Sequence, residues 1–382
     1  MVKFIPGSQT YSLVSLLSIV GEFPTFSLAL IGNRRTLYGL ISKLSEIHEV
    51  RDVNENILMT GRIINVVGKG AKRRIRLDND ALPLLEYLGV KNYYTKTFLK
   101  YRFPSDATHI ERTCKYAELC AIFMNSNIEF RPQNLPELQA KSSIKRIQKE
   151  TIFYQAKSFK SIKVPEYNTL VRNSKIIGML VAYDEAFLVY NFRNYWPKKA
   201  MEGEGKTMIF VDLIARYNFE VKKTTSAIIF GKNYKTALRT LKSYLVLSKK
   251  NIRLDDIYKN IIFIPNTDFG IRIARLFTVR NWRQKIFQSL FGSKLIADGE
   301  RPFHAVEGEV SIFSFLDSNI TKLMCFRDYL INTKAQGGVV CYPEQETLVR
   351  EYLGPKVKIK SILIDRVEEV LRVNKRRLFD EK

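Results

Sequence analysis

The segment IGNRRTLYGLISKLSEI, residues 31–47, carries an amphipathic pattern from which the structure of the N-terminal part of the chain can be predicted. Its apolar residues recur at the spacing of one face of an α-helix, at Ile31, Leu37, Leu40, Ile41, Leu44 and Ile47. The opposite side carries polar and basic residues, namely Asn33, Arg34, Arg35, Thr36, Tyr38 and Lys43. The start of a helix favours acidic side chains because the positive end of its dipole lies there. Two arginines at this position therefore favour a ligand that supplies negative charge.

The neighbouring segments predict a winged helix-turn-helix around this helix. YSLVSLLSIVGEF (11–23) predicts a first helix, and FSLALIG (26–32) predicts a short second one. Beyond the third helix, GRIINVVGKGAKRRIRL (61–77) contains two β-prone runs around a glycine-rich turn, which indicates a hairpin. NDALPLLEYLG (79–89) is the helix expected to close the domain.

The hairpin is strongly basic, with no acid before Asp78. Its cationic residues are Lys69, Lys72, Arg73, Arg74 and Arg76. In a winged helix the third helix enters the major groove and the hairpin contacts the DNA backbone or the minor groove. Arginine can pair with guanine and asparagine with adenine, so the residues of the third helix suit this role. Regular alternation along the second strand would place Arg74 and Arg76 on one face, and Arg73 on the other with Ile75 and Leu77.

The composition of the whole chain agrees with a nucleic-acid partner. The 382 residues include 62 Lys+Arg against 38 Asp+Glu, a formal net charge of +24, and a protein this basic usually neutralises a polyanion. The four cysteines and three histidines lack zinc-site spacing, which indicates a reducing compartment and no metal. Glu22 and Pro24 interrupt the apolar N-terminus before it reaches the roughly 20 residues of a bilayer span. We therefore expect a soluble, cytoplasmic protein without membrane contact.

The chain as a whole is expected to be α/β, or α+β when both parts are counted together. Residues 1–90 form the predicted winged-helix domain. Residues 91–165 contain a helix, at 109–127, and a basic connector with little core character, at 131–165. Residues 166–382 alternate short apolar strands with amphipathic helices, which predicts a mixed-sheet α/β domain.

Two parts of the chain resemble the replication-relaxation family of plasmid and conjugative-element proteins. The first part is RRTLYGLISKLSEI (34–47) together with KRRIRLDNDALPLLEYLG (72–89), although residues 77–81 lack the family's Thr and Gly. The second is VPEYNTLVRNSKIIGMLVAYDEAFLVYNFRNYW (164–196). The resemblance implies an N-terminal winged helix, and a C-terminal domain related to the restriction-endonuclease fold.

A metal-dependent nuclease of that fold needs an acid before or on one strand and an acid-x-Lys on the next, so that carboxylates hold Mg²⁺. Glu166 could be the first acid, and Asp184 and Glu185 are the other weak candidates. The strand that should carry the acid-x-Lys reads EAFLVYNF (185–192) and lacks lysine. We therefore expect a nuclease-like but non-catalytic domain with no cofactor, and Mg²⁺ enters only under the nuclease alternative.

The sequence thus predicts a double-stranded-DNA-binding protein of a bacterial plasmid or mobile element, acting in replication, transfer or its regulation. The α/β domain is expected to dock replication or transfer proteins or to form a homodimer. Two alternatives stay open: a Mg²⁺-dependent, sequence-directed endonuclease, and a structural or assembly protein of a phage or mobile element.

Overall fold

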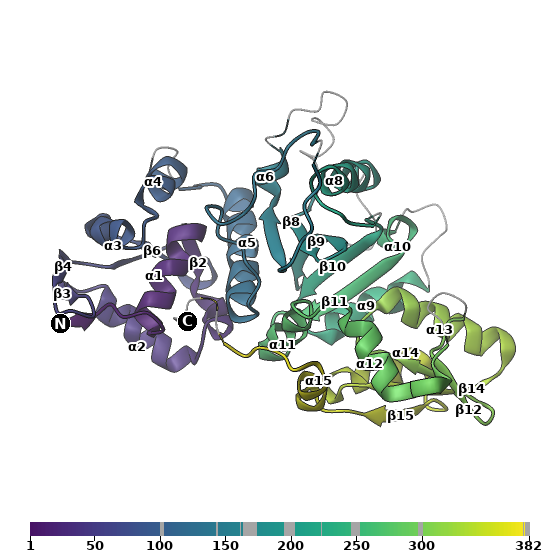
Figure 1. The fold of residues 1–382 in the computed structure, drawn as a ribbon. Helices are drawn as coiled ribbons and strands as arrows, with labels where there is room; N and C mark the ends of the chain where they lie inside the picture. Colours follow the sequence, from purple (N-terminus) through teal and green to yellow (C-terminus); the bar gives the residue numbers. More distant parts are fainter. Residues whose placement is uncertain are drawn as a thin grey trace. The chain divides into compact units, whose positions relative to one another are not determined.

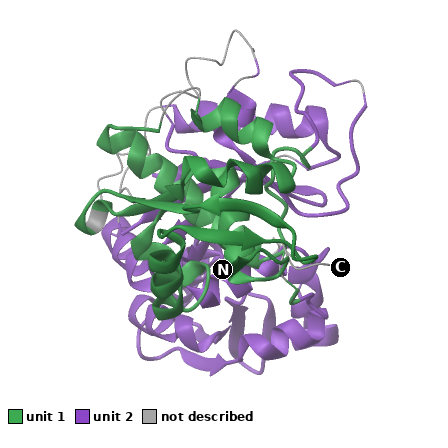
Figure 2. Ribbon diagram, turned by 90° about the vertical axis from the view of Figure 1, so that its left-hand side faces the viewer, with its two compact units in different colours: residues 1–135, 375–382 green, residues 136–374 purple. Residues whose placement is uncertain are grey.

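The computed structural model describes residues 1–99, 103–142, 144–160, 162, 174–194, 203–222, 224–245, 253–296, 301–376 and 378. The chain divides into two compact units, residues 1–135 with 375–382, and residues 136–374 (Figure 2). Helices and mixed sheets occur together, so the predicted α/β class is confirmed. Among the described residues, no helix is long and apolar enough to cross a bilayer.

The first unit has the element order of a winged helix-turn-helix (Figure 1). The elements are α1 (Gln9–Val20), β2 (Glu22–Pro24), the 3-10 helix η1 (Thr25–Leu30), α2 (Arg34–Leu44), β5 (Ile64–Val67) and β6 (Arg74–Leu77). The three strands form an antiparallel sheet in which β6 lies between β2 and β5. The predicted three helices and hairpin are therefore present, with the second helix as a 3-10 helix.

Other elements of the first unit complete its core. Between α2 and β5 the chain forms β3 (His48–Arg51) and β4 (Ile57–Gly61), and β1 (Val2–Lys3) at the start of the chain pairs with β3 to complete a small sheet. The sequence pattern did not predict this sheet because its strands are short and partly polar. After the wing come α3 (Leu82–Tyr87), α4 (Lys91–Tyr94), the π-helix η4 (Thr95–Leu99) and α5 (Ala107–Asn125). The second half of α5 is buried, and the helix packs against α1 and β2. The first unit thus extends to residue 135, whereas the sequence pattern ended the winged-helix domain at residue 90.

A five-stranded mixed sheet is the core of the first half of the second unit. Its strands are β7 (Ile152–Gln155), β8 (Gly178–Ala182), β9 (Glu185–Arg193), β10 (Ser226–Gly231) and β11 (Asn260–Pro265). The first three are antiparallel neighbours, and β9, β10 and β11 run parallel. The helices of this half are α6 (Ala156–Lys160), α8 (Glu204–Asn218), α9 (Tyr234–Tyr244), α10 (Leu254–Ile257) and α11 (Asp268–Leu276).

Strand β7 corrects the prediction of a connector without core character over 131–165. Ile152, Phe153 and Tyr154 are all buried, and β7 pairs with β8 along its whole length. The run is only four residues long and lies in a lysine-rich segment, so its apolar signal was too short to stand out. The α/β domain accordingly begins before the predicted residue 166.

The second half of this unit is a four-stranded sheet with mostly parallel strands. It consists of β12 (Ala305–Glu307), β13 (Val310–Ser314), β14 (Gln336–Cys341) and β15 (Lys358–Ser361), in that order. The helices are α12 (Trp282–Phe291), α13 (Ile320–Thr333), α14 (Glu346–Leu353) and α15 (Ile364–Leu371), with short 3-10 turns η5 (Gly292–Lys294) and η6 (Pro343–Gln345).

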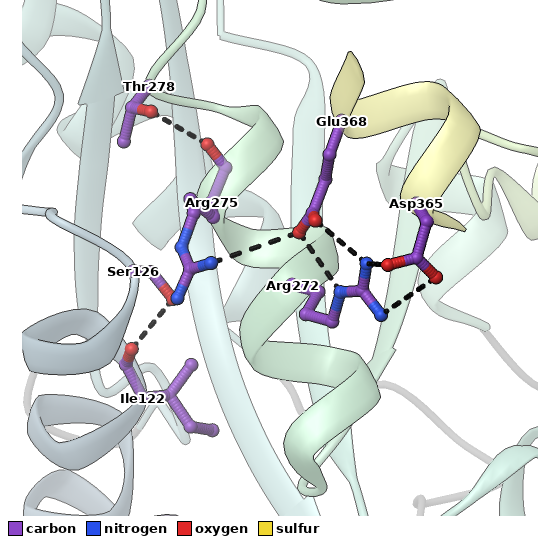
Figure 3. Close-up of polar contacts among 7 residues, drawn as sticks. All are labelled: Ile122, Ser126, Arg272, Arg275, Thr278, Asp365 and Glu368. Atoms are coloured by element: carbon purple, nitrogen blue, oxygen red, sulfur yellow. Dashed lines mark hydrogen bonds and ion pairs between the residues drawn. The ribbon is translucent and has the colours of Figure 1, made fainter. Parts of the chain in front are cut away.

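An ion-pair cluster fastens α15 to α11 (Figure 3). The carboxylate of Glu368, which is 2% exposed, accepts hydrogen bonds from Nε and Nη2 of Arg272 at 3.0 and 2.7 Å. Asp365 accepts a further bond from Arg272 at 2.8 Å, and Arg275 lies 3.8 Å from Glu368. Because the buried carboxylate faces cations of the neighbouring helix, the last helix of the second unit has a defined position against α11.

Candidate nucleic-acid interface

The start of α2 presents cations that no acid of its own first turn neutralises. Asn33 is the N-cap, and its Oδ1 accepts hydrogen bonds from the backbone N–H groups of Arg35 and Thr36 at 3.0 and 3.2 Å. The side chains of Arg34, Arg35 and Thr36 are exposed, and the first turn contains no acidic residue. Two exposed arginines therefore lie at the positive end of the helix dipole, which is favourable for an anion.

Tyr38 is half-buried one turn further along α2. Its hydroxyl donates a hydrogen bond to the carbonyl oxygen of Thr25 at 3.3 Å and accepts one from Nη2 of Arg34 at 3.3 Å. The Arg34 guanidinium also lies 5.5 Å from the centroid of the Tyr38 ring. The hydrogen bond from Arg34 lowers the pKa of Tyr38 below its ordinary value. Tyr38 thus positions Arg34 in addition to being a candidate contact, and Lys43 at the other end of the helix is exposed.

The wing turn presents Lys69, Lys72 and Arg73, all of them exposed. Gly68 and Gly70 adopt φ angles of 76° and 54°, which a residue with a side chain rarely does, so these glycines allow the tight turn between β5 and β6. The three cations project from this turn and not from the paired strands.

Thr25 joins the wing to the helix. Its backbone N–H and its hydroxyl both donate to the carbonyl oxygen of Arg73, each at 3.1 Å, while its own carbonyl oxygen accepts from Tyr38. The positive charge of Arg73 also contributes to the lowered pKa of Tyr38. The structure therefore brings the helix start and the base of the wing turn together through one residue. The sequence pattern did not predict Thr25, because its role depends on a contact 48 residues away.

Arg74 and Arg76 correct the predicted set of DNA-binding residues. Nε of Arg74 lies 2.9 Å from the carboxylate of Glu22, and Nη1 of Arg76 lies 3.9 Å from the same carboxylate. Glu22 is 1% exposed, and the strand register places it directly opposite Arg76. Arg76 also lies over the ring of Phe103, with its guanidinium carbon 4.9 Å from the centroid. The charges of both arginines are therefore engaged within the protein.

The predicted alternation put Arg73 on the same face as Ile75 and Leu77, but strand β6 begins only at Arg74. Ile75 and Leu77 are buried, and Arg74 and Arg76 share the opposite face as expected. Arg73 precedes the strand and belongs to the turn, so it does not point into the core. The sequence could have indicated this counter-ion, because Glu22 is the only acid among residues 1–45.

The weak catalytic candidates are paired with cations or cannot be placed. Glu166 lies outside the described residues. Asp184 lies in the two-residue turn between β8 and β9, with an oxygen 3.1 Å from Nζ of Lys222. The Glu185 carboxylate accepts two hydrogen bonds from Nη1 of Arg283, at 2.9 and 2.8 Å. Across the described ranges, no three acidic, histidine or cysteine side chains form a group that could hold a metal ion.

Comparisons with protein-family models, with curated proteins and with solved structures found no match for this chain. The functional argument accordingly rests on the geometry of α2 and the wing.

Proposed function

We propose that this protein binds duplex DNA through α2 and the wing turn, in the replication, transfer or regulation of a bacterial plasmid or mobile element. The observation that supports the proposal best is the link through Thr25. It holds two groups of exposed cations together, one at the start of α2 and one at the wing turn. Two separate basic loops could bind anions individually, but a linked pair can contact one duplex at two places.

The residues of α2 are suited to contacts with base edges, and those of the wing turn to contacts with phosphates. Arg35 and Thr36 at the start of α2 can hydrogen-bond base edges in the major groove, and the Nδ2 group of Asn33 has no acceptor among the described residues. Lys69, Lys72 and Arg73 on the wing turn can neutralise phosphates, which adds affinity that depends on salt. Arg34 belongs to the group at the helix start, and the Tyr38 hydroxyl connects it to Thr25.

The resemblance to replication-relaxation proteins motivates the biological part of the proposal. Under it, the second unit docks replication or transfer proteins, or a second copy of the chain. Asp184 and Glu185 form ion pairs with Lys222 and Arg283, so they offer no support for the endonuclease alternative.

The experiment measures binding of the full-length chain to a fluorescently labelled duplex of mixed sequence, by anisotropy at low and moderate salt. We expect Arg34→Ala with Arg35→Ala to weaken binding by about tenfold or more, because both guanidinium groups at the helix start are removed. The matched control is Lys358→Ala with Lys360→Ala, which removes the same charge from exposed positions on β15.

A drop in affinity for the α2 variant alone supports the proposal. Equal affinity of the α2 variant and the wild type contradicts it, as does equal weakening by the control. If the wild type does not raise the anisotropy of the labelled DNA even at low salt, the structural or assembly alternative is favoured, since the positive charge of such a protein would face an acidic protein instead.

A further inference from the structure

A basic segment near the start of the second unit is held in place by hydrogen bonds and has no role in the proposed function. We call residues 139–149 (QAKSSIKRIQK) the strap; all of it is described except residue 143. The side chain of Asn218, 2% exposed at the end of α8, fastens one end of the strap. Its Nδ2 donates to the carbonyl oxygen of Gln139 at 2.9 Å, and its Oδ1 accepts from the N–H of Gln139 at 2.8 Å.

A second attachment lies at Arg146. Its backbone N–H donates to the carbonyl oxygen of Asn218 at 3.0 Å, and its carbonyl oxygen accepts from the N–H of Glu220 at 3.0 Å. The Arg146 guanidinium also donates to the carbonyl oxygen of Glu137 at 3.0 Å. The backbone of the strap is therefore attached at two points to the end of α8 and the residues that follow it.

Two isoleucines project from this fastened backbone into solvent. Ile144 is 77% exposed and Ile147 is 68% exposed, and Ile144 is the most exposed large hydrophobic side chain among the described residues. Single exposed apolar residues are common on protein surfaces. Two on either side of a backbone attachment point are a different arrangement, because the protein holds them outward.

The isoleucines are flanked by cations. Lys141, Lys145 and Lys149 are exposed, and none of them forms an ion pair with an acid of the described residues. The strap itself contains no acid. An apolar side chain that is carried between cations is the arrangement by which proteins insert a wedge between base steps from the minor groove, while lysines contact the flanking phosphates.

We propose that the strap is a second DNA contact, in which Ile144 and Ile147 enter the minor groove and unstack a base step, so that the duplex bends. Lys141, Lys145 and Lys149 neutralise the flanking phosphates. The proposal rests on the proposed function of α2 and the wing. Duplex DNA fits better than an acidic protein segment, because two isolated isoleucines offer little apolar area to a peptide, whereas a wedge needs only one or two side chains.

The test measures energy transfer between fluorophores at the two ends of a short mixed-sequence duplex that is fully bound by the full-length protein. We expect wild-type protein to raise the transfer efficiency, as a bend within the range of about 20–90° would do. Ile144→Ala with Ile147→Ala should return the efficiency close to that of free DNA while binding persists. Ile331→Ala, a 55% exposed residue on α13, is the control and should leave the bend unchanged.

A second pair of substitutions tests the cations separately. Lys145→Ala with Lys149→Ala should reduce the magnitude of the negative slope of log K against log salt by about 0.9 for each phosphate that is no longer neutralised. An unchanged bend in the isoleucine variant, or an unchanged slope in the lysine variant, overturns the proposal while binding by α2 and the wing still stands. If Arg34→Ala with Arg35→Ala abolishes binding and no strap variant changes it, the strap does not contact DNA, and an acidic protein becomes its expected partner. Absence of DNA binding by the wild type would instead remove the proposed function itself.

Discussion

The carboxylate of Glu22 decides which cations of the wing are available to a ligand. It lies 2.9 Å from Nε of Arg74 and 3.9 Å from Nη1 of Arg76, and only 1% of the side chain is exposed. A buried carboxylate is stable only when it is paired and hydrogen-bonded. Arg74 and Arg76 therefore contribute to the fold of the first unit, and the three cations of the wing turn remain available to a ligand. At this scale the sequence predicts which residues are basic, but not which of them the protein neutralises itself.

Replacement of Glu22 should reveal this structural role. Glu22→Gln leaves the guanidinium of Arg74, 11% exposed, without its counter-charge, so we expect the free energy of unfolding to fall by on the order of 3 kcal/mol. Urea unfolding followed by circular dichroism measures the change. Glu55→Gln is the control, because its ion pair with Lys3 is half-exposed and should contribute less than about 1 kcal/mol. Equal unfolding midpoints for Glu22→Gln and wild type would show that the pair does not stabilise the unit.

Among the elements, α2 and the wing illustrate what periodicity can and cannot predict. The helix, the hairpin and most strands of the second unit have strong local patterns, and the structure contains them. Strands β1 and β7 are short and pair with partners far along the chain, and β3 forms a hairpin with β4 from short, partly polar strands that give a weak pattern. The contact of Thr25 with Tyr38 and Arg73 likewise depends on tertiary packing, so no sequence spacing could predict it.

Removing the Tyr38 hydroxyl should loosen the link between α2 and the wing. Tyr38→Phe removes the hydrogen bonds with Thr25 and Arg34, so we expect DNA affinity to fall by about three- to tenfold while the fold is retained. The control is Leu40→Met, at a half-buried position on the same helix, and this variant should bind DNA with wild-type affinity. If both variants bind with wild-type affinity, the hydroxyl does not organise the interface.

The lowered pKa of Tyr38 gives this element a pH signature. Because its pKa lies below the ordinary tyrosine value in the folded state, ionisation of the phenol favours the folded state. This contribution to stability is present in full above pH 10 and disappears as the pH falls through the lowered pKa. The difference in ultraviolet absorbance titration between wild type and Tyr38→Phe isolates this phenol. Arg34→Ala should shift its titration to higher pH, since the hydrogen bond from Arg34 is the main cause of the lowering.

For the whole molecule, the excess of cations predicts an attraction to polyanions. Residues 56–77 contain six basic residues and no acid, and the structure assigns two of the six to Glu22. Charge and element order together could be predicted from the sequence, because both follow from local patterns. The extent of the first unit could not be predicted from the sequence, because α5 belongs to this unit through its packing against α1 and β2, which no local sequence pattern reveals.

The most direct test of the central claim is the salt dependence of duplex binding by the full-length chain. The comparison includes the wild type, a helix variant (Arg35→Ala with Lys43→Ala), a wing variant (Lys72→Ala with Arg73→Ala) and the combination of all four substitutions. We predict that each double variant reduces the magnitude of the negative slope of log K against log salt by about 0.9 for each phosphate that its side chains neutralise in the wild type. The combined variant should show the sum of both reductions. A combined variant with the slope and affinity of the wild type would contradict the claim that α2 and the wing contact one duplex.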